Sequence, residues 1–319
     1  MKAPPKISVL VPTYNRESTL VQSLSSIFNQ TIPPYEVIVI DDGSSDNTNR
    51  ILEDFSQKHS NFLFIHQENR GKSAALNRGL PLASGNFIAF NDSDDLWKTD
   101  KLEKQLIALE RFPECEVCFT DTKYGAEGET TTLQLAKILL TSQYGELENA
   151  AKRIVKDGTG IMMQTLLVRA PSMVRAGPFD EILKVAQDAD FIMRLSLSSR
   201  FCYVNEPLVI LDRVPSRSRL TTDYDANSII SLEQQKHQHS KWRSYFSAKE
   251  TSTLLSLATA RYCDTLNALS NSHLKIGQSE NAKASLEEAF QVSHNYKYKL
   301  KKLFISTFPK LSTRLLCSD

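Results

Sequence analysis

The sequence predicts an α/β protein with an open, mostly parallel sheet, followed by a C-terminal α-helical appendage. Short apolar runs at 7–11, 36–40, 62–66 and 87–90 have the length and boundaries of buried strands. The segments between them carry apolar residues at helical spacing, as expected where helices connect parallel strands. From about Asn227 strand patterns cease while helical spacing continues. We therefore expect two domains, at 1–226 and 227–319.

Each element of the first domain follows from its own pattern. A helix within 16–30 places Leu20, Leu24 and Ile27 on one face, and the next follows a cap at Ser45 or Asp46. Because proline cannot donate a ladder hydrogen bond, we expect Pro207 to divide 201–211 into two short strands. The remaining expected elements are helices at 72–83, 99–112 and 188–199 and strands at 116–120 and 161–169.

The second domain has helical signals only. Gly277 separates two helical patterns within 253–290, which predicts a helical hairpin. Beyond it, lysines alternate with aromatic and aliphatic residues to the end of the chain. Such a basic amphipathic segment can lie on an anionic membrane surface. Packing on the first domain with a solvated basic face explains the pattern equally well.

Composition excludes several classes of protein. The 319 residues include 38 Lys and Arg against 37 Asp and Glu, so we expect no nucleic-acid partner. Five scattered cysteines do not form a secreted disulfide framework, which favours the reducing cytosol. We expect Cys115 and Cys118 to be core or edge residues of a strand rather than a zinc or redox site, and His237 and His239 to lie at the surface. No apolar run reaches the roughly 18 residues of a membrane span, so we expect a cytoplasmic protein, at most peripheral to a membrane.

Polar residues gather where the predicted strands end. Ligands of parallel sheets bind beyond the carboxyl ends of the strands, where this chain has Pro12-Thr13-Tyr14, Asp41-Asp42-Gly43 and Asn91-Asp92-Ser93-Asp94-Asp95. Clustered carboxylates raise each other's pKa unless a cation compensates, and Asp92 and Asp94 suit a hard divalent ion. Taken alone, each acidic string also suits a turn or a helix cap.

Four strings stand out along the chain: SVLVPTYNR at 8–16, EVIVIDDGSSD at 36–46, NRGKSAALN at 69–77 and FNDSDDLW at 90–97. In their order and spacing they resemble the family-2 glycosyltransferases of the GT-A fold. The resemblance is close over about the first 100 residues and looser to about residue 213.

The resemblance implies a nucleotide-sugar donor, with UDP as the default carrier, and Mn²⁺ or Mg²⁺ as cofactor. It implies that Asp92 and Asp94 are the metal ligands, and that Asp42 accepts a hydrogen bond from the edge of the nucleotide base. Lys72 would approach the base or the diphosphate. The full implied donor-binding set is Pro12, Thr13, Tyr14, Asp41, Asp42, Lys72, Asp92 and Ser93.

The same resemblance implies a general base that deprotonates the acceptor hydroxyl. Asp188 matches this position, with Asp190 as the second candidate, whereas the preceding Glu of the family is Gln187 here. A helix N-cap is the structural alternative for Asp188. Displacement with one base implies inversion at the sugar carbon, and the absence of a Gln-x-x-Arg-Trp string favours one sugar per encounter. Loop arginines that could cover the diphosphate are Arg213, Arg217 and Arg219.

We therefore predict an inverting glycosyltransferase that acts on a saccharide or glycolipid acceptor in the synthesis of surface polysaccharide, lipopolysaccharide or glycolipid. Gln187 supports a second hypothesis, in which the chain is an inactive nucleotide-sugar-binding or scaffold protein that uses the helical appendage. A sugar-phosphate nucleotidylyltransferase is disfavoured, since Pro12-Thr13-Tyr14-Asn15 lacks the Gly-rich, basic phosphate loop such an enzyme carries after its first strand.

Overall fold

The protein is described here by a computed structural model. It describes residues 4–124, 130–157, 160–211, 228–249 and 251–316. The chain forms two compact units, considered over these residues. The sheet unit comprises Met1–Ile182 and Gln187–Arg217, and the helical unit comprises Leu183–Ala186 and Ser218–Asp319. In the described ranges, no helix is both long and apolar enough to cross a membrane.

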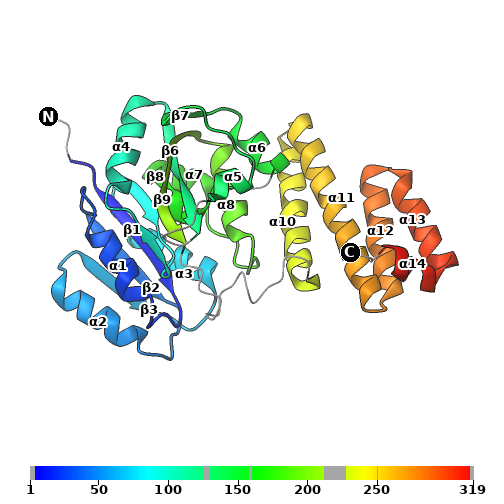
Figure 1. Cartoon of the computed structure of the whole chain (residues 1–319), viewed down its shortest axis with the longest axis horizontal. Helices are drawn as coiled ribbons and strands as arrows, with labels where there is room; N and C mark the ends of the chain where they lie inside the picture. The colour runs from blue at the N-terminus through cyan, green and yellow to red at the C-terminus, as the bar shows by residue number, and fades with distance from the viewer. Residues whose placement is uncertain (1–3, 125–129, 158–159, 212–227, 250, 317–319) are drawn as a thin grey trace. The chain divides into compact units, whose positions relative to one another are not determined.

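The predicted α/β class is confirmed, with one mixed sheet in the sheet unit (Figure 1). Its first half is parallel, in the order β3-β2-β1-β4, and every strand in it was predicted. Side chains alternate between the two faces, so Val9 and Val37 belong to the core formed with the helices α1 and α2. The elements are β1 (Ile7–Thr13), α1 (Leu20–Phe28), β2 (Glu36–Asp41), α2 (Thr48–Lys58), β3 (Phe62–His66) and β4 (Phe87–Phe90).

The opposite face of the parallel half packs on α3 (Lys72–Gly79). A Cβ on Gly79 would lie 2.4 Å from Ile40 Cδ1 and 3.2 Å from Leu10 Cδ2. Only a residue without a side chain lets this helix approach the sheet so closely. The sheet is thus covered on both faces, as parallel strands require.

The second half of the sheet runs β8-β6-β9-β5, with β7 paired to β9. Within the described residues it contains three antiparallel pairings and one parallel pairing, β6 with β9, and β8 also pairs antiparallel with β4 of the first half. The predicted core location of Cys115 and Cys118 is confirmed, since both are fully buried. The strands are β5 (Asp95–Trp97), β6 (Cys115–Tyr124), β7 (Tyr144–Leu147), β8 (Leu167–Arg169) and β9 (Arg200–Leu211).

One strand prediction in this half is wrong, and another is too long. Pro207 does not divide 201–211, because β9 is continuous and places Pro207 opposite Asp121 at an irregularity of the register. A bulge tolerates a residue that cannot donate a hydrogen bond. Of the strand predicted at 161–169, only Leu167–Arg169 form a strand, β8. Residues Met163–Thr165 before it form a 3-10 turn.

The helices of the sheet unit beyond α3 were predicted only in part. α4 (Lys101–Arg111) and α8 (Gln187–Ser196) were expected, with ends that differ by one to three residues. Shorter helices were missed, because a segment of four to eight residues shows barely two turns of periodicity. These are α5 (Thr132–Leu135), α6 (Ala150–Asp157) and α7 (Ala170–Ala176).

The helical unit contains more than the predicted hairpin. Gly277, with φ of +78°, does separate α11 from α12, as its sequence position indicates. The surface prediction for His239 is wrong, because this side chain is 6% exposed and its Nδ1 lies 3.0 Å from Thr265 Oγ1. The helices are α10 (Ile229–Ala248), α11 (Ser252–Lys275), α12 (Ser279–Ser293), α13 (Tyr296–Thr307) and α14 (Pro309–Leu316).

Candidate functional site

The ends of β1, β2 and β4 form one polar edge of the sheet. Asp42 N donates to Thr13 O at 2.8 Å, and Asn91 N donates to Leu10 O at 3.0 Å. The three predicted strand-end loops are therefore neighbours, as the parallel order β2-β1-β4 requires.

Asp42 organises the turn that leads into α3. Its Oδ1 accepts from Gln67 Nε2 at 2.7 Å and from Arg70 N at 2.9 Å, and its Oδ2 accepts from Gly71 N at 2.8 Å. Gly71 has φ of +94°, a conformation that favours glycine. The next residue is Lys72, so Asp42 fixes the backbone from which the Lys72 side chain extends.

Asp41 contacts Ser44 in the loop that follows β2 and His66 at the end of β3. The side chain is fully buried, and its carboxylate accepts from Ser44 N and Oγ and lies 2.6 Å from His66 Nδ1. These contacts stabilise the loop after β2. A direct contact of Asp41 with a donor stays a prediction.

The end of β1 and the residue that follows it carry one buried and one exposed side chain. Thr13 is buried, and within the described part of the chain its Oγ1 has no hydrogen-bond partner. Tyr14 is 44% exposed, although such a large ring is usually buried. Pro12 is half-buried. An aromatic face beside a polar edge suits the stacking of a flat heterocyclic base.

Lys72 joins the metal motif to the predicted base. Its Nζ lies 2.8 Å from Asp92 Oδ1 and 3.1 Å from Asp188 Oδ2. Burial by itself lowers the pKa of Lys72, but the carboxylates of Asp188 and Asp92 outweigh it and raise the pKa above the ordinary value. The side chain is therefore a permanent cation between two carboxylates that lie far apart in the sequence.

Asp188 is held at the start of α8 with one oxygen unused. Oδ2 accepts from Lys72, whereas Oδ1 is buried and has no partner among the described residues. Burial raises the pKa of Asp188, and Lys72 opposes that shift. A carboxylate with a raised pKa is a stronger base than an exposed one.

Asp190, the second candidate base, has a different environment. It is fully buried, and its Oδ2 accepts from Arg194 Nε at 3.0 Å. Arg194 also donates to the carbonyl of Ala176. Asp190 therefore anchors α8 to the neighbouring helix α7, and the geometry favours Asp188 as the base. Gln187 is buried beside them, and its Oε1 has no partner in the described chain.

Arg16 contacts the motif and Gln164 contacts Asp95 directly after it, and the sequence had assigned neither residue a role. Arg16 Nη2 lies 3.6 Å from Asp94 Oδ2, and its position just after β1 was a signal for such a contact. Gln164 Nε2 donates to Asp95 Oδ2 at 2.7 Å. Burial, followed by the charges of Asp92 and Asp94, raises the pKa of Asp95 well above its ordinary value. No sequence pattern linked residue 164 to residue 95.

The motif fits a divalent ion that is shared with a substrate. Asp92 and Asp94 present partly exposed carboxylates, at 29% and 19%, whereas Ser93 between them is buried. In the described ranges, no group of three or more His, Cys, Asp or Glu side chains could hold a metal alone. Two carboxylates suit Mn²⁺ or Mg²⁺ if phosphate oxygens and waters supply the other ligands. Arg213, Arg217 and Arg219 lie outside the described residues.

Comparison with known proteins identifies one family. The sequence matches the model of glycosyl transferase family 2 over residues 8–167, which is half of the chain. It is 43% identical over 100 residues to a protein of Escherichia coli, the UDP-Glc:alpha-D-GlcNAc-diphosphoundecaprenol beta-1,3-glucosyltransferase WfgD, covering 31% of this chain and 39% of that one. It is 38% identical over 128 residues to the putative teichuronic acid biosynthesis glycosyltransferase TuaG of Bacillus subtilis, covering 40% and 50%. The chain spans 17 to 50% of the length of the first three curated relatives it matches.

Two solved structures share the fold. Staphylococcus aureus TarS 1–349 in complex with UDP-GlcNAc aligns with a TM-score of 0.70 at 19% identity, covering 98% of this chain and 90% of that one. The mannosyltransferase PcManGT of Pyrobaculum calidifontis, in complex with GDP-Man and Mn²⁺, aligns with a TM-score of 0.57 at 19% identity, covering 99% and 84%. Both alignments extend over nearly the whole chain.

Proposed function

The chain belongs to glycosyl transferase family 2, and we propose that it moves one sugar from a nucleotide-diphosphate sugar to an acceptor hydroxyl with inversion. One observation carries the proposal, the convergence of Asp92, Lys72 and Asp188 at the polar edge of the sheet. It combines a carboxylate for a metal, a cation for a diphosphate and a base within one small region.

Each part of the donor has a counterpart in this region. The loop Pro12–Tyr14 and Asp42 bind the nucleotide, with the exposed Tyr14 ring against the base. Asp92 and Asp94 hold Mn²⁺ or Mg²⁺, which when bound neutralises charge that develops on the leaving diphosphate. Lys72 donates to the same diphosphate.

Asp188 supplies the base. Its free Oδ1 accepts the proton of the acceptor hydroxyl while the acceptor oxygen bonds to the sugar carbon. The bond from that carbon to the diphosphate oxygen breaks in the same displacement, and the electron pair leaves with the nucleoside diphosphate. A single displacement inverts the configuration at the sugar carbon.

We propose that the donor is a UDP-sugar and that the acceptor is a growing surface polysaccharide or a glycolipid. WfgD is named for a UDP-linked donor and a diphosphoundecaprenol acceptor, and TuaG for teichuronic acid synthesis. The test is release of UDP from a panel of UDP-sugars, with saccharide and undecaprenyl-diphosphate-linked acceptors, in Mn²⁺ or EDTA. Acceptor-dependent, Mn²⁺-dependent release supports transfer. Binding without release under every condition would support the inactive scaffold instead.

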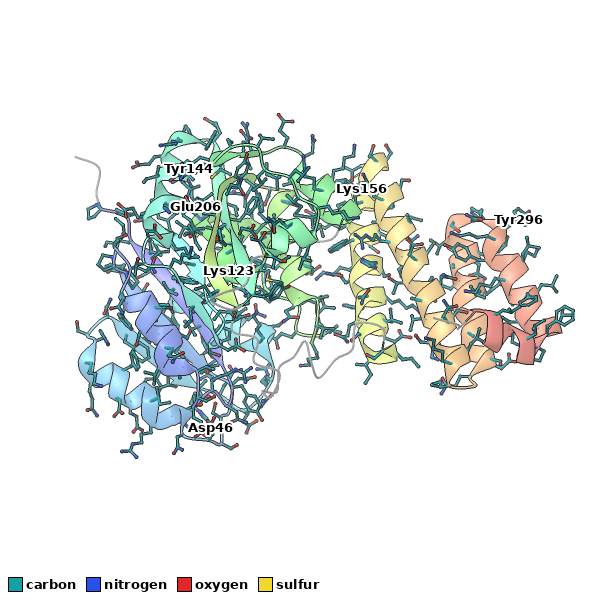
Figure 2. The ribbon with its side chains drawn as sticks, viewed as in Figure 1. Asp46, Lys123, Tyr144, Lys156, Glu206 and Tyr296 are labelled. Atoms are coloured by element: carbon teal, nitrogen blue, oxygen red, sulfur yellow. The ribbon has the colours of Figure 1, made fainter. Side chains whose placement is uncertain are left out.

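The end of the helical unit supports a membrane-surface acceptor. Apolar side chains are exposed along α13 and α14, among them Tyr296, labelled in Figure 2, at 67% and Leu300 at 65%. No acidic residue occurs between Glu288 and Asp319, whereas six basic residues do. An apolar stripe flanked by lysines is typical of helices that lie on anionic lipid. We place the protein at the inner face of the cell membrane.

Vesicle binding tests this placement. We expect co-sedimentation with phosphatidylglycerol vesicles and little with phosphatidylcholine vesicles. Replacing both Leu300 and Leu303 by Glu should abolish it. The matched control, Val174→Glu, changes an 83% exposed side chain in the sheet unit and should leave binding intact. Equal binding to both lipids, or an unaffected double variant, would contradict a membrane role for this face.

A further inference from the structure

Both carboxylates of the metal motif already hold a cation that comes from elsewhere in the chain. Asp92 is paired with Lys72 at 2.8 Å, and Asp94 with Arg16 at 3.6 Å. Lys72 belongs to the start of α3 and Arg16 to the loop after β1. The motif is therefore neutralised from two sides by the protein itself.

A divalent ion and these two cations need the same carboxylate oxygens. An ion bound to Asp92 would lie beside the Lys72 ammonium, and like charges repel strongly where water is restricted. A metal that binds Asp92 must therefore displace the Lys72 ammonium, unless another anion attracts the ammonium away. The diphosphate of a donor is such an anion, and its oxygens accept hydrogen bonds from lysine and arginine.

The geometry allows Lys72 to exchange partners without movement of the backbone. Asp42 fixes Arg70 N and Gly71 N, so the start of α3 is anchored. The long Lys72 side chain is 12% exposed, so it is not completely enclosed by the protein. A flexible four-carbon chain with a compact charge suits such an exchange.

We propose that Lys72, assisted by Arg16, is an internal competitor of the metal, and that the donor diphosphate draws these cations away from the motif. This inference rests on the proposed donor site. Metal and nucleotide then bind cooperatively, and linkage requires each to strengthen the other by the same factor. Departure of Lys72 also releases Asp188 Oδ2 from its ion pair, so the second oxygen of the base is released only when the donor is present.

Calorimetric titration tests the competition without measuring turnover. Mn²⁺ is titrated into the full chain with and without UDP, and UDP is titrated with and without Mn²⁺. In the wild-type protein we expect UDP to tighten Mn²⁺ binding by about tenfold or more. Lys72→Met should tighten Mn²⁺ binding in the absence of UDP and reduce the coupling by about fivefold. Arg16→Met should act in the same direction with a smaller effect, because its pair with Asp94 is longer.

Two controls keep the result interpretable. Lys58→Met removes an exposed lysine at the end of α2 and should leave both affinities unchanged. Lys72→Arg retains the charge, so Mn²⁺ binding in the absence of UDP should stay weak, and unchanged melting of each variant excludes misfolding. Coupling that is absent in the wild type, or unchanged in Lys72→Met, would overturn the competition while leaving the proposed transferase intact. Failure of UDP to bind under any condition would overturn both.

Discussion

The two units differ in how they satisfy buried polar groups. Across the described residues, eight of the nine buried side-chain nitrogen and oxygen atoms without a partner belong to the sheet unit, and one, Ser270 Oγ, belongs to the helical unit. In the helical unit, buried His239 contacts Thr265 and buried Gln238 donates to Ala186 O. Burying an unpartnered polar atom usually costs about 1–3 kcal/mol.

Three of the unpartnered atoms of the sheet unit belong to residues of the candidate site or of the strand ends beside it. Thr13 Oγ1 is at the end of β1, Asn91 Oδ1 directly follows β4, and Asp188 Oδ1 belongs to the carboxylate that pairs with Lys72. Unpartnered polar atoms beside a set of strand ends are characteristic of a binding site, where unsatisfied groups serve function. The helical unit, in contrast, has the paired interior of a structural element.

The largest effect is expected on turnover, and it should distinguish two aspartates of α8, Asp188 and Asp190. Asp188→Asn should lower the turnover number by about 10³-fold, because a positioned base contributes on the order of 10²–10⁴. Thermal stability and donor binding should change little. Asp190→Asn should instead lower stability by about 3 kcal/mol of unfolding free energy and change turnover little, because Arg194, 11% exposed, loses its carboxylate partner. Rates and melting curves of the two variants check the contrast, and a similar loss of turnover in both would remove it.

The next effect concerns acid stability of the helical unit. Burial, and then the charge of Arg261, lower the pKa of His239 to about 4. The unfolded chain, with an ordinary pKa near 6.5, therefore takes up the proton first. Stability should be constant above pH 6.5 and fall as the pH drops toward 4, with a loss that approaches about 3 kcal/mol.

Urea unfolding between pH 4 and 7.5 measures this loss. The chain has two tryptophans, so fluorescence in a Trp97→Phe background reports on buried Trp242 alone. His239→Asn should flatten the pH dependence, whereas His237→Asn, at a half-buried position, should not. An unchanged slope in His239→Asn would assign the acid sensitivity to other groups.

A smaller effect on stability is expected from alanine substitutions at two glycines with positive φ. Gly43 and Gly277 have φ of +81° and +78°, so alanine is strained at both by about 1–2 kcal/mol. At Gly277 nothing lies within 4 Å of the added Cβ, but at Gly43 the Cβ would lie 2.9 Å from Asn69 N. Gly43→Ala should therefore lower the melting temperature more and also weaken UDP binding. Equal losses would mean that the loop after β2 relaxes freely.

The sequence predicted the parallel half of the sheet well because local and global signals agree there. Buried strands such as Val37–Ile40 are continuous apolar runs, and the acidic residues that follow them mark their ends. The motif and base positions came from the family resemblance. Their convergence on Lys72 depends on contacts across 20 and 116 positions, which no local pattern encodes.

The second half of the sheet was less predictable for the same reason. The continuity of β9 through Pro207 depends on the irregular register opposite Asp121, which belongs to another strand. The burial of His239 depends on its packing against Thr265 in a neighbouring helix. In both cases a tertiary contact overrides the local preference of the residue.

The most direct test of the site is thermal stabilisation of the protein by UDP-, GDP- and dTDP-sugars, with and without Mn²⁺, beside an Asp94→Asn variant. A ligand at about 100 times its Kd should add about 2.7 kcal/mol. We predict that one nucleotide class stabilises the wild-type protein, that Mn²⁺ strengthens the effect, and that Asp94→Asn loses the Mn²⁺-dependent part. Absence of stabilisation by every nucleotide sugar, or an undiminished response in Asp94→Asn, would contradict a donor site at Asp92 and Asp94.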